Sequence, residues 1–574
     1  MPERARLIRP ALALAAFLLG GCAGPLPLAD PADMILTGGR VVTLDADSSV
    51  VQALAIKGER IIAVGSDRDI AARAGARTQR IDLAGRTVIP GLIDSHIHAI
   101  RAGLTYEAAA DWTGAASIAD AMARIGARAA VTPPGQWIVV SGGWTEQQFA
   151  ERRRPSQAEL IAAAPDHPVY VQLSYRAALL TPAGSRALNI ASDADLPSGA
   201  RREQDAAGAF TGWIEGPSPS IVALFARLPK PDLSARMAST RAFFRELNRL
   251  GLTGALDPGG HNLAPEDYDV PFALARAGDL SLRLDYSIFA PRPGRELQDL
   301  QSLARDMPLQ HSRDGLLRFN GVGEAVTWGM YNNETPSEAQ KDDYYRVARW
   351  AAEQGLTLTQ HWNSDKSVHH LLEVFERVNR DLPLAPLRWS IAHLHDASVE
   401  TLARMKALGI GWLMQDGTYF AAPLFLANRA PQLRRQSPPI VSAIAMGLPV
   451  GAGTDADRVM DYNPFVALRW MLDGLTVGGE PTRDAAQIPT REQALRLYTQ
   501  GSAWFAFDEA RRGSLEMGKL ADLAVLDADY FTVPTPDIAR IRSLLTVVGG
   551  QVVYAAEPYG KSRESAELFP ERRR

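Results

Sequence analysis

The middle of the chain alternates short apolar runs with amphipathic stretches. The runs are rich in Val, Ile and Leu, while the stretches between them, such as 342–354 and 399–408, carry the 3.6-residue period of helices. This alternation is typical of a parallel sheet or barrel. The predicted strands are 88–93, 252–256, 281–288, 316–322, 356–360, 387–392, 409–414 and 448–453. Eight strands with intervening helices predict a (β/α)8 TIM barrel, an α/β fold.

Both ends of the chain show strand patterns of a different kind, separated by glycine turns. They lie at 34–36, 40–44, 53–56, 60–64 and 79–83, and again at 521–526, 545–548 and 551–554. We expect one small β-sandwich domain without helices, built from 33–87 and 510–560, beside a barrel at 88–509. A long insertion of about 105–240, with a helix predicted at 117–130, separates the first two barrel strands and could cap the barrel mouth.

Composition narrows the class of protein. The 574 residues are too many for one ordinary domain, and the hydrophobic fraction of 46% is that of a globular protein. The net charge is −4 and no basic stripe is present, so no nucleic-acid partner is expected.

The N-terminus has the pattern of a secretory signal. A basic flank precedes the apolar run 11–19, which is shorter than the ~20 residues of a membrane span, and small residues lead to Cys22. The segment resembles a bacterial lipobox, which implies a signal peptide at 1–22, cleavage before Cys22 and lipidation of its thiol. Residues 23–32 would form a tether, and 561–574 a tail. Ala23 resembles an outer-membrane sorting signal, so we expect a lipid-anchored protein at the periplasmic face of the outer membrane of the bacterial cell envelope.

Histidines directly follow the first, fifth and sixth predicted strands. His96 and His98 follow the first strand, and side chains at i and i+2 share one face of a strand. His361 follows the fifth strand, His393 the sixth and Asp455 ends the eighth. Because the C-terminal strand ends of a TIM barrel meet at one mouth, these residues predict a divalent metal site suited to zinc, with an open position for water.

The same positions, in the same order, resemble those of the amidohydrolase superfamily. Residues 87–94 and 513–526 resemble the segments by which that family enters and leaves its barrel. Residues 142–144 and 166–169 resemble amidohydrolase family 3, the branch that includes N-substituted formamide deformylase. The resemblance covers nearly the whole mature chain.

The resemblance implies a metal-dependent hydrolase of a small molecule. His96, His98, His361 and His393 would hold one or two divalent ions. Asp455 would ligate the metal or hydrogen-bond its water, and would shuttle the proton. The implied reaction is hydrolysis of a non-peptide carbon–nitrogen bond, in an amide, formamide or cyclic amide, by metal-bound hydroxide.

Several positions depart from the family pattern or leave alternatives open. Where many relatives carry a bridging lysine after the fourth strand, Glu324 stands nearby, as a metal ligand or as a solvent-facing residue. Arg176 could hold a substrate carboxylate or form a surface ion pair. His395 and Asp365 are candidates for substrate contact or for support of a ligand imidazole. Trp144 could line the pocket or pack in a core.

Two other functions stay open at this point. The same site could hydrolyse an ester or lactone, or deaminate a ring. A non-catalytic, lipid-anchored binding protein would have lost a ligand or Asp455, whereas all five principal positions are present. The substrate, the metal count and the oligomeric state, with a homodimer among the options, do not follow from these residues.

Overall fold

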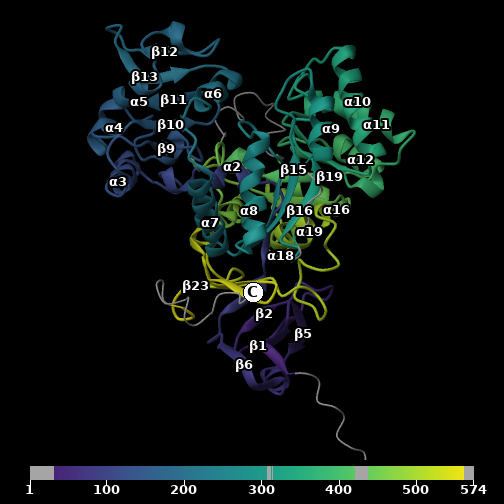
Figure 1. Ribbon diagram of the computed structural model, residues 1–574. Helices are drawn as coiled ribbons and strands as arrows, with labels where there is room; N and C mark the ends of the chain where they lie inside the picture. The colour runs from purple at the N-terminus through teal and green to yellow at the C-terminus, as the bar shows by residue number, and fades with distance from the viewer. Residues whose placement is uncertain (1–30, 307–311, 313, 421–436, 561–574) are drawn as a thin grey trace, which may run out of the picture.

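Eight parallel strands form the central sheet of the computed structural model, which describes residues 31–306, 312, 314–420 and 437–560 (Figure 1). Their spatial order is β20-β19-β18-β17-β16-β15-β14-β8. The bounds are β8 (Leu92–Asp94), β14 (Leu252–Asp257), β15 (Arg283–Ile288), β16 (Leu317–Val322), β17 (Thr357–Trp362), β18 (Ser390–His393), β19 (Gly411–Gln415) and β20 (Val450–Gly453). The sheet closes where the backbone N–H of Ser95, just after β8, donates to the carbonyl of Ala452 in β20 at 3.0 Å. The predicted α/β barrel is thereby confirmed.

Helices surround the barrel and pack their apolar faces on it in one large core. They include α7 (Leu233–Arg249), α8 (Asp269–Ala277), α9 (Glu296–Asp306), α10 (Glu338–Glu353), α11 (Asp365–Asn379), α12 (Val399–Leu408), α16 (Ile440–Ala445), α17 (Pro464–Asp473), α18 (Arg491–Arg496) and α19 (Ser502–Phe505). Local signals set their ends. Ser337 and Gln340 form a capping box at the start of α10, and Gly409 ends α12 with a φ of 68°.

The first predicted strand, 88–93, is wrong as a single element. It divides at Gly91 into β7 (Thr87–Pro90) and β8, which belong to different sheets. A Cβ at Gly91 would lie 2.2 Å from the side chain of Thr253, so only glycine allows the chain to pass this closely to β14. This division carries the chain into the barrel directly before His96.

A terminal β region, which we define as β1–β7 and β21–β23, joins the two ends of the chain at the bottom of Figure 1. Its sheets have the orders β5-β4-β1-β6 and β23-β22-β21-β7-β2-β3. The bounds are β1 (Ala32–Thr37), β2 (Arg40–Val42), β3 (Val50–Val51), β4 (Ala53–Lys57), β5 (Arg60–Gly65), β6 (Ala74–Asp82), β21 (Leu523–Leu526), β22 (Ser543–Val548) and β23 (Gln551–Ala555). Residues of both sheets share one apolar core. The expected absence of helices is wrong, because α1 (Asp67–Ala71) begins at the N-cap Ser66. The sandwich packing and the domain boundaries stay predictions.

The insertion has a sheet of its own, at the upper left of Figure 1. Its strand order is β12-β13-β11-β10-β9, with β9 (Ile138–Val140), β10 (Val169–Leu173), β11 (Ala177–Leu180), β12 (Arg201–Gln204) and β13 (Phe210–Glu215). Its helices are α3 (Ile118–Ala129), which confirms the predicted helix, α4 (Gln157–Ala163), α5 (Pro182–Ala187) and α6 (Ser218–Phe225). Its core includes Trp112, Trp144 and Phe149.

The predicted signal peptide, the lipidation site Cys22, most of the tether and the tail 561–574 lie outside the described residues. Across the described part of the chain, the helices are all too short or too polar to cross a membrane.

Candidate active site

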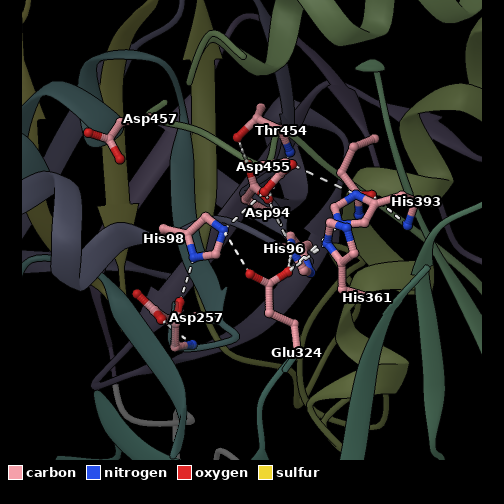
Figure 2. Close-up of polar contacts among 12 residues, drawn as sticks. Asp94, His96, His98, Asp257, Glu324, His361, His393, Thr454, Asp455 and Asp457 are labelled. Atoms are coloured by element: carbon pink, nitrogen blue, oxygen red, sulfur yellow. Dashed lines mark hydrogen bonds and ion pairs between the residues drawn. The ribbon is translucent and has the colours of Figure 1, made fainter. Parts of the chain in front are cut away.

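Six polar side chains meet above the C-terminal ends of the barrel strands (Figure 2). His361 lies in β17 and His393 ends β18, while the other four directly follow strands: His96 and His98 after β8, Glu324 after β16 and Asp455 after β20. Five of the six are buried, and His361 is half-buried. A cavity of about 510 Å³ opens above them and is walled by the insertion as well as by the barrel loops. The residues predicted to share one site do so, although up to 359 positions separate them in the chain.

Glu324 stands at the centre of the group. Its Oε2 lies 3.4 Å from Nε2 of His96, 3.3 Å from Nδ1 of His361 and 3.7 Å from Nε2 of His393, and its Oε1 lies 3.6 Å from Nε2 of His98. Burial would raise the pKa of this carboxyl, but the surrounding imidazoles, His98 foremost, hold it well below its usual range. Of the two alternatives left by the sequence, Glu324 therefore faces the site and not the solvent.

Asp455 closes the group from the other side. Its Oδ1 lies 3.0 Å from Nε2 of His98 and 3.5 Å from Nε2 of His96, and its Oδ2 lies 3.8 Å from Nδ1 of His393. Burial lowers the pKa of His96, but Asp455 and Glu324 outweigh it and raise that pKa to about 10. Asp455 and His393 also have φ angles of 56° and 70°, a region that residues other than glycine seldom adopt. The fold thus holds both side chains in place at a backbone cost.

The donor set fits a divalent metal ion. Both ring nitrogens of His96 and Nε2 of His393 are buried and lack a hydrogen-bond partner among the described residues. Ligand atoms of His96, His98 and Asp455 lie within 4.8 Å of one another, and so do those of His96, Glu324 and His393. Buried polar atoms are normally paired, and imidazoles with carboxylates are the ligands of zinc and similar ions. Two overlapping groups that share His96 leave room for one ion or two.

A backbone carbonyl fixes the orientation of His98. The Nδ1–H of His98 donates to the carbonyl of Gly259, so its Nε2 faces Asp455 and Glu324. Asp257 holds this loop, because its carboxylate accepts from the N–H of Gly259 and the N–H of Ile100, both at 2.7 Å. Asp257 was not among the predicted site residues, although a carboxylate at the end of the second barrel strand was a usable signal.

Asp94 ties the first barrel strand to the last. Its carboxylate accepts from the N–H of His96 at 3.0 Å, and from the N–H and hydroxyl of Thr454 at 3.1 and 2.7 Å. Burial raises the pKa of Asp94 to about 7. These bonds hold the residues just before Asp455 against the His96 backbone. Asp94 was also missed, although it stands two positions before His96.

His361 has neighbours that its strand pattern does not indicate. The side-chain amide of Asn332 donates to its Nε2 at 2.6 Å, and the ring of Tyr331 stacks on the imidazole at 4.4 Å between centroids. Its Nδ1 faces Glu324. Asn332 and Tyr331 come from the loop after β16, where no periodicity or spacing marks them.

The remaining candidates lie around the cavity or away from it. Arg176 is at the cavity wall, but its guanidinium contacts both carboxylate oxygens of Glu146 at 2.9 Å, so a substrate carboxylate would have to displace Glu146. His395 is half-buried and lines the cavity. Trp144 packs in the core of the insertion and also borders the cavity. Asp365 accepts from the N–H of Ser398 at 2.8 Å and so orders a loop.

Comparisons with known proteins point to one family. The amidohydrolase family model matches residues 79–554. The N-substituted formamide deformylase of Arthrobacter pascens is 24% identical over 543 residues, which cover 91% of this chain and 98% of that protein. An uncharacterized metal-dependent hydrolase from Pyrococcus furiosus has a similar structure, with a TM-score of 0.62 and 21% identity over 87% of this chain and 100% of that chain. Atrazine chlorohydrolase TrzN from Arthrobacter aurescens TC1, solved with zinc, has a TM-score of 0.52 and 16% identity. The match covers 91% of this chain and 95% of that chain.

The family match spans the barrel and the insertion, together with β7, β21, β22 and most of β23 of the terminal β region. The resemblance inferred from the histidine pattern is thereby confirmed, and so is the expectation of an enzyme. The chain belongs to the amidohydrolase family and is a hydrolase.

Proposed function

We propose that this enzyme hydrolyses the carbon–nitrogen bond of a small, non-peptide amide, formamide or cyclic amide in the cavity above the barrel. The observation that carries the proposal is the convergence of four imidazoles and two carboxylates at a cavity of about 510 Å³, which all of them except His96 line. Ring nitrogens of His96 and His393 have no hydrogen-bond partner among the described residues. A cavity of this size is ordinary for a small organic ligand. The similarity to a formamide deformylase supports the amide class.

His96, His98, Glu324, His393 and Asp455 would hold the metal, with His361 beside them. Zinc suits the mixed nitrogen and oxygen donors, and the zinc in the atrazine chlorohydrolase structure supports this choice. When bound, a divalent cation polarises a carbonyl oxygen and lowers the pKa of water to about 7. The Gly259 carbonyl keeps Nε2 of His98 directed at the site, and the walls of the cavity limit the access of bulk water.

Asp455 is the proposed proton carrier. Its carboxylate lies at the cavity wall and reaches the floor of the site, so it can take a proton from the attacking water and return it to the leaving nitrogen. Glu324 balances the positive charge of the site from the opposite side. The attachment of the protein to the outer membrane through Cys22 remains a separate proposal that follows from the N-terminal pattern alone.

Metal analysis tests the site directly. The purified protein, loaded with zinc and desalted, should hold one or two ions per chain by mass spectrometry of the metal. His96→Ala should lose most of this metal, because both ligand groups use His96. Glu324→Gln distinguishes a site with one ion from a site with two. If the wild type holds two ions and this variant holds one, Glu324 is a ligand of the second ion. His369→Ala, in the exposed cluster His369, His370 and Glu373 on α11, is the matched control and should keep all ions.

A metal content below one ion per chain in the wild type, unchanged in His96→Ala, would contradict the proposed metal site.

The reaction is tested with a panel of N-acyl, N-formyl and cyclic amides, together with lactones. Amide turnover supports the proposal, whereas exclusive turnover of lactones would favour the alternative left open by the sequence.

A further inference from the structure

A second cavity of about 100 Å³ is lined by residues of both the insertion and the barrel. Arg101 and Arg458 form its polar wall, and Leu104, Trp137, Val139 and Phe225 contribute apolar walls. The two cavities share structural elements. His98 and Asp455 border the first cavity, while Arg101, one helical turn after His98, and Arg458, three positions after Asp455, border the second.

Arg101 lines this cavity and has hydrogen-bond donors without a partner among the described residues. Its side chain is almost fully buried, and Nη1 and Nη2 have no hydrogen-bond partner among the described residues. Only Nε is engaged, by Asp457 at 3.2 Å. A buried guanidinium with two free nitrogens is costly, because such donors are normally paired.

Arg458 adds a second buried cation at the same place. Its Nε also lacks a partner in the described part of the chain, its Nη1 donates to Asn262, and its guanidinium lies 3.9 Å above the ring of Phe225. Burial, followed by the charge of Arg101, lowers the pKa of Arg458 to about 10. Both guanidinium groups line the cavity, and Asp457 is the one carboxylate among the described residues that line it, so the lining has an excess of positive charge.

The other charges of the cavity do not remove this excess. Lys230 and Arg236 both bind Asp267, at 3.1 and 2.8 Å, so that this carboxylate is already shared by two cations. A ligand that completes the cavity must therefore be anionic at one end and apolar at the other. An apolar cavity of roughly 150 Å³ in a protein can hold benzene. The present cavity is smaller, so it accepts only a short hydrocarbon chain.

We propose that Arg101 and Arg458 bind the carboxylate of a short aliphatic acid, whose hydrocarbon part lies against Phe225 and its apolar neighbours. Arginine is the side chain suited to a carboxylate, because its planar donors pair with both oxygens. Gly260 lies between this site and His98, since an added Cβ there would lie 2.7 Å from Nδ1 of His98 and 3.1 Å from Nη1 of Arg101.

The acid can come from two sources, given the proposed amide hydrolysis on which this step rests. It is either a carboxylate group of the substrate or the carboxylic acid that hydrolysis releases. The chemistry of recognition is the same for both.

Calorimetric titration of the zinc-loaded protein with sodium butyrate tests the site without any assay of turnover. Butyrate should bind, while 1-butanol, which has the same chain without the charge, should not. Arg101→Gln and Arg458→Gln should each weaken butyrate binding at least tenfold. Ala226→Trp, at an exposed position on the rim, should obstruct the cavity while leaving both arginines in place. Arg241→Gln, which breaks an exposed pair with Asp279, is the matched control and should bind as the wild type.

Metal content is measured on every variant, so failure here is distinct from failure of the proposed function. Equal binding of butyrate and butanol, absence of binding, or binding that survives both arginine substitutions would overturn the proposal. If Arg101→Gln does not fold, butyrate binding by Arg458→Gln and Ala226→Trp tests the proposal instead.

Two kinetic arms identify the source of the acid. If the carboxylate belongs to the substrate, amides with a terminal carboxylate should have a higher kcat/KM than their neutral analogues, and Arg458→Gln should abolish the difference. If it belongs to the product, butyrate should inhibit hydrolysis of neutral amides, with a tenfold higher inhibition constant in Arg458→Gln.

Discussion

The identity of the site residues followed from residue type and spacing, whereas their conformations did not. His96, His98, His361, His393 and Asp455 were predicted because imidazoles and a carboxylate after the first, fifth, sixth and eighth strands form a recognisable order. The left-handed backbone of His393 and Asp455 left no sign in the sequence, since neither position is a glycine. Such strain at a site of converging side chains indicates that the fold, and not local preference, positions them.

The proton carrier is tested by the smallest change available. In Asp455→Asn the amide is nearly isosteric with the carboxylate but cannot take up a proton at neutral pH. We expect turnover to fall by about 10²- to 10⁴-fold, the usual contribution of a general acid–base group. Bound metal should change far less, because His96, His98 and His393 remain. Turnover and metal content are measured on the same preparation, and unchanged turnover would remove Asp455 from the mechanism.

At the scale of elements, apolar runs predicted all eight barrel strands, because a buried parallel strand is apolar along its whole length. The loops after those strands were less predictable. Asn332 and Tyr331 contact His361 from a loop without periodicity, and only the fold brings them there. The division of 88–93 was missed for a related reason, since its cause is the side chain of Thr253, far away in sequence.

Gly91 is therefore a sensitive position in the fold. In Gly91→Ala the new methyl group would meet Thr253 at 2.2 Å, so either β8 or β14 must shift. Overpacking of this kind costs about 1–3 kcal/mol or more. We expect a lower midpoint of thermal unfolding. Because β8 leads into His96, we also expect a lower affinity for the metal. Gly126→Ala in helix α3 is the control, where the nearest atom would be 3.6 Å away and the helix should gain stability. Equal midpoints for the two variants would contradict this account of Gly91.

At the scale of the whole molecule, buried ion pairs link the barrel to the C-terminal segment. Arg512, which precedes the return to the terminal β region, binds Asp285 of β15 at 2.6 Å and Asp508 at 2.9 Å. Arg283, also of β15, binds Asp522 at 2.7 Å. More than two hundred residues separate each long-range pair, so no local pattern predicts them. They fix the C-terminal segment against strand β15 of the barrel.

The pH dependence of stability follows from this network. Burial would raise the pKa of Asp285, but Arg512 and then Arg318 outweigh it, so its pKa is lower in the folded protein than in the unfolded chain. The unfolded chain therefore binds more protons. The stabilisation by Asp285 is complete above the unfolded pKa of about 3.9 and declines as the pH falls below it.

Asp285→Asn should lower the free energy of unfolding at pH 7 by about 3–5 kcal/mol, the usual cost of breaking a buried pair. The difference between the urea midpoints of variant and wild type should then narrow as the pH falls from 4 to 3. Asp279→Asn, in an exposed pair, should differ little from the wild type at any pH. A difference for Asp285→Asn that stays constant through this range would show that packing of the side chain, and not its charge, stabilises the junction.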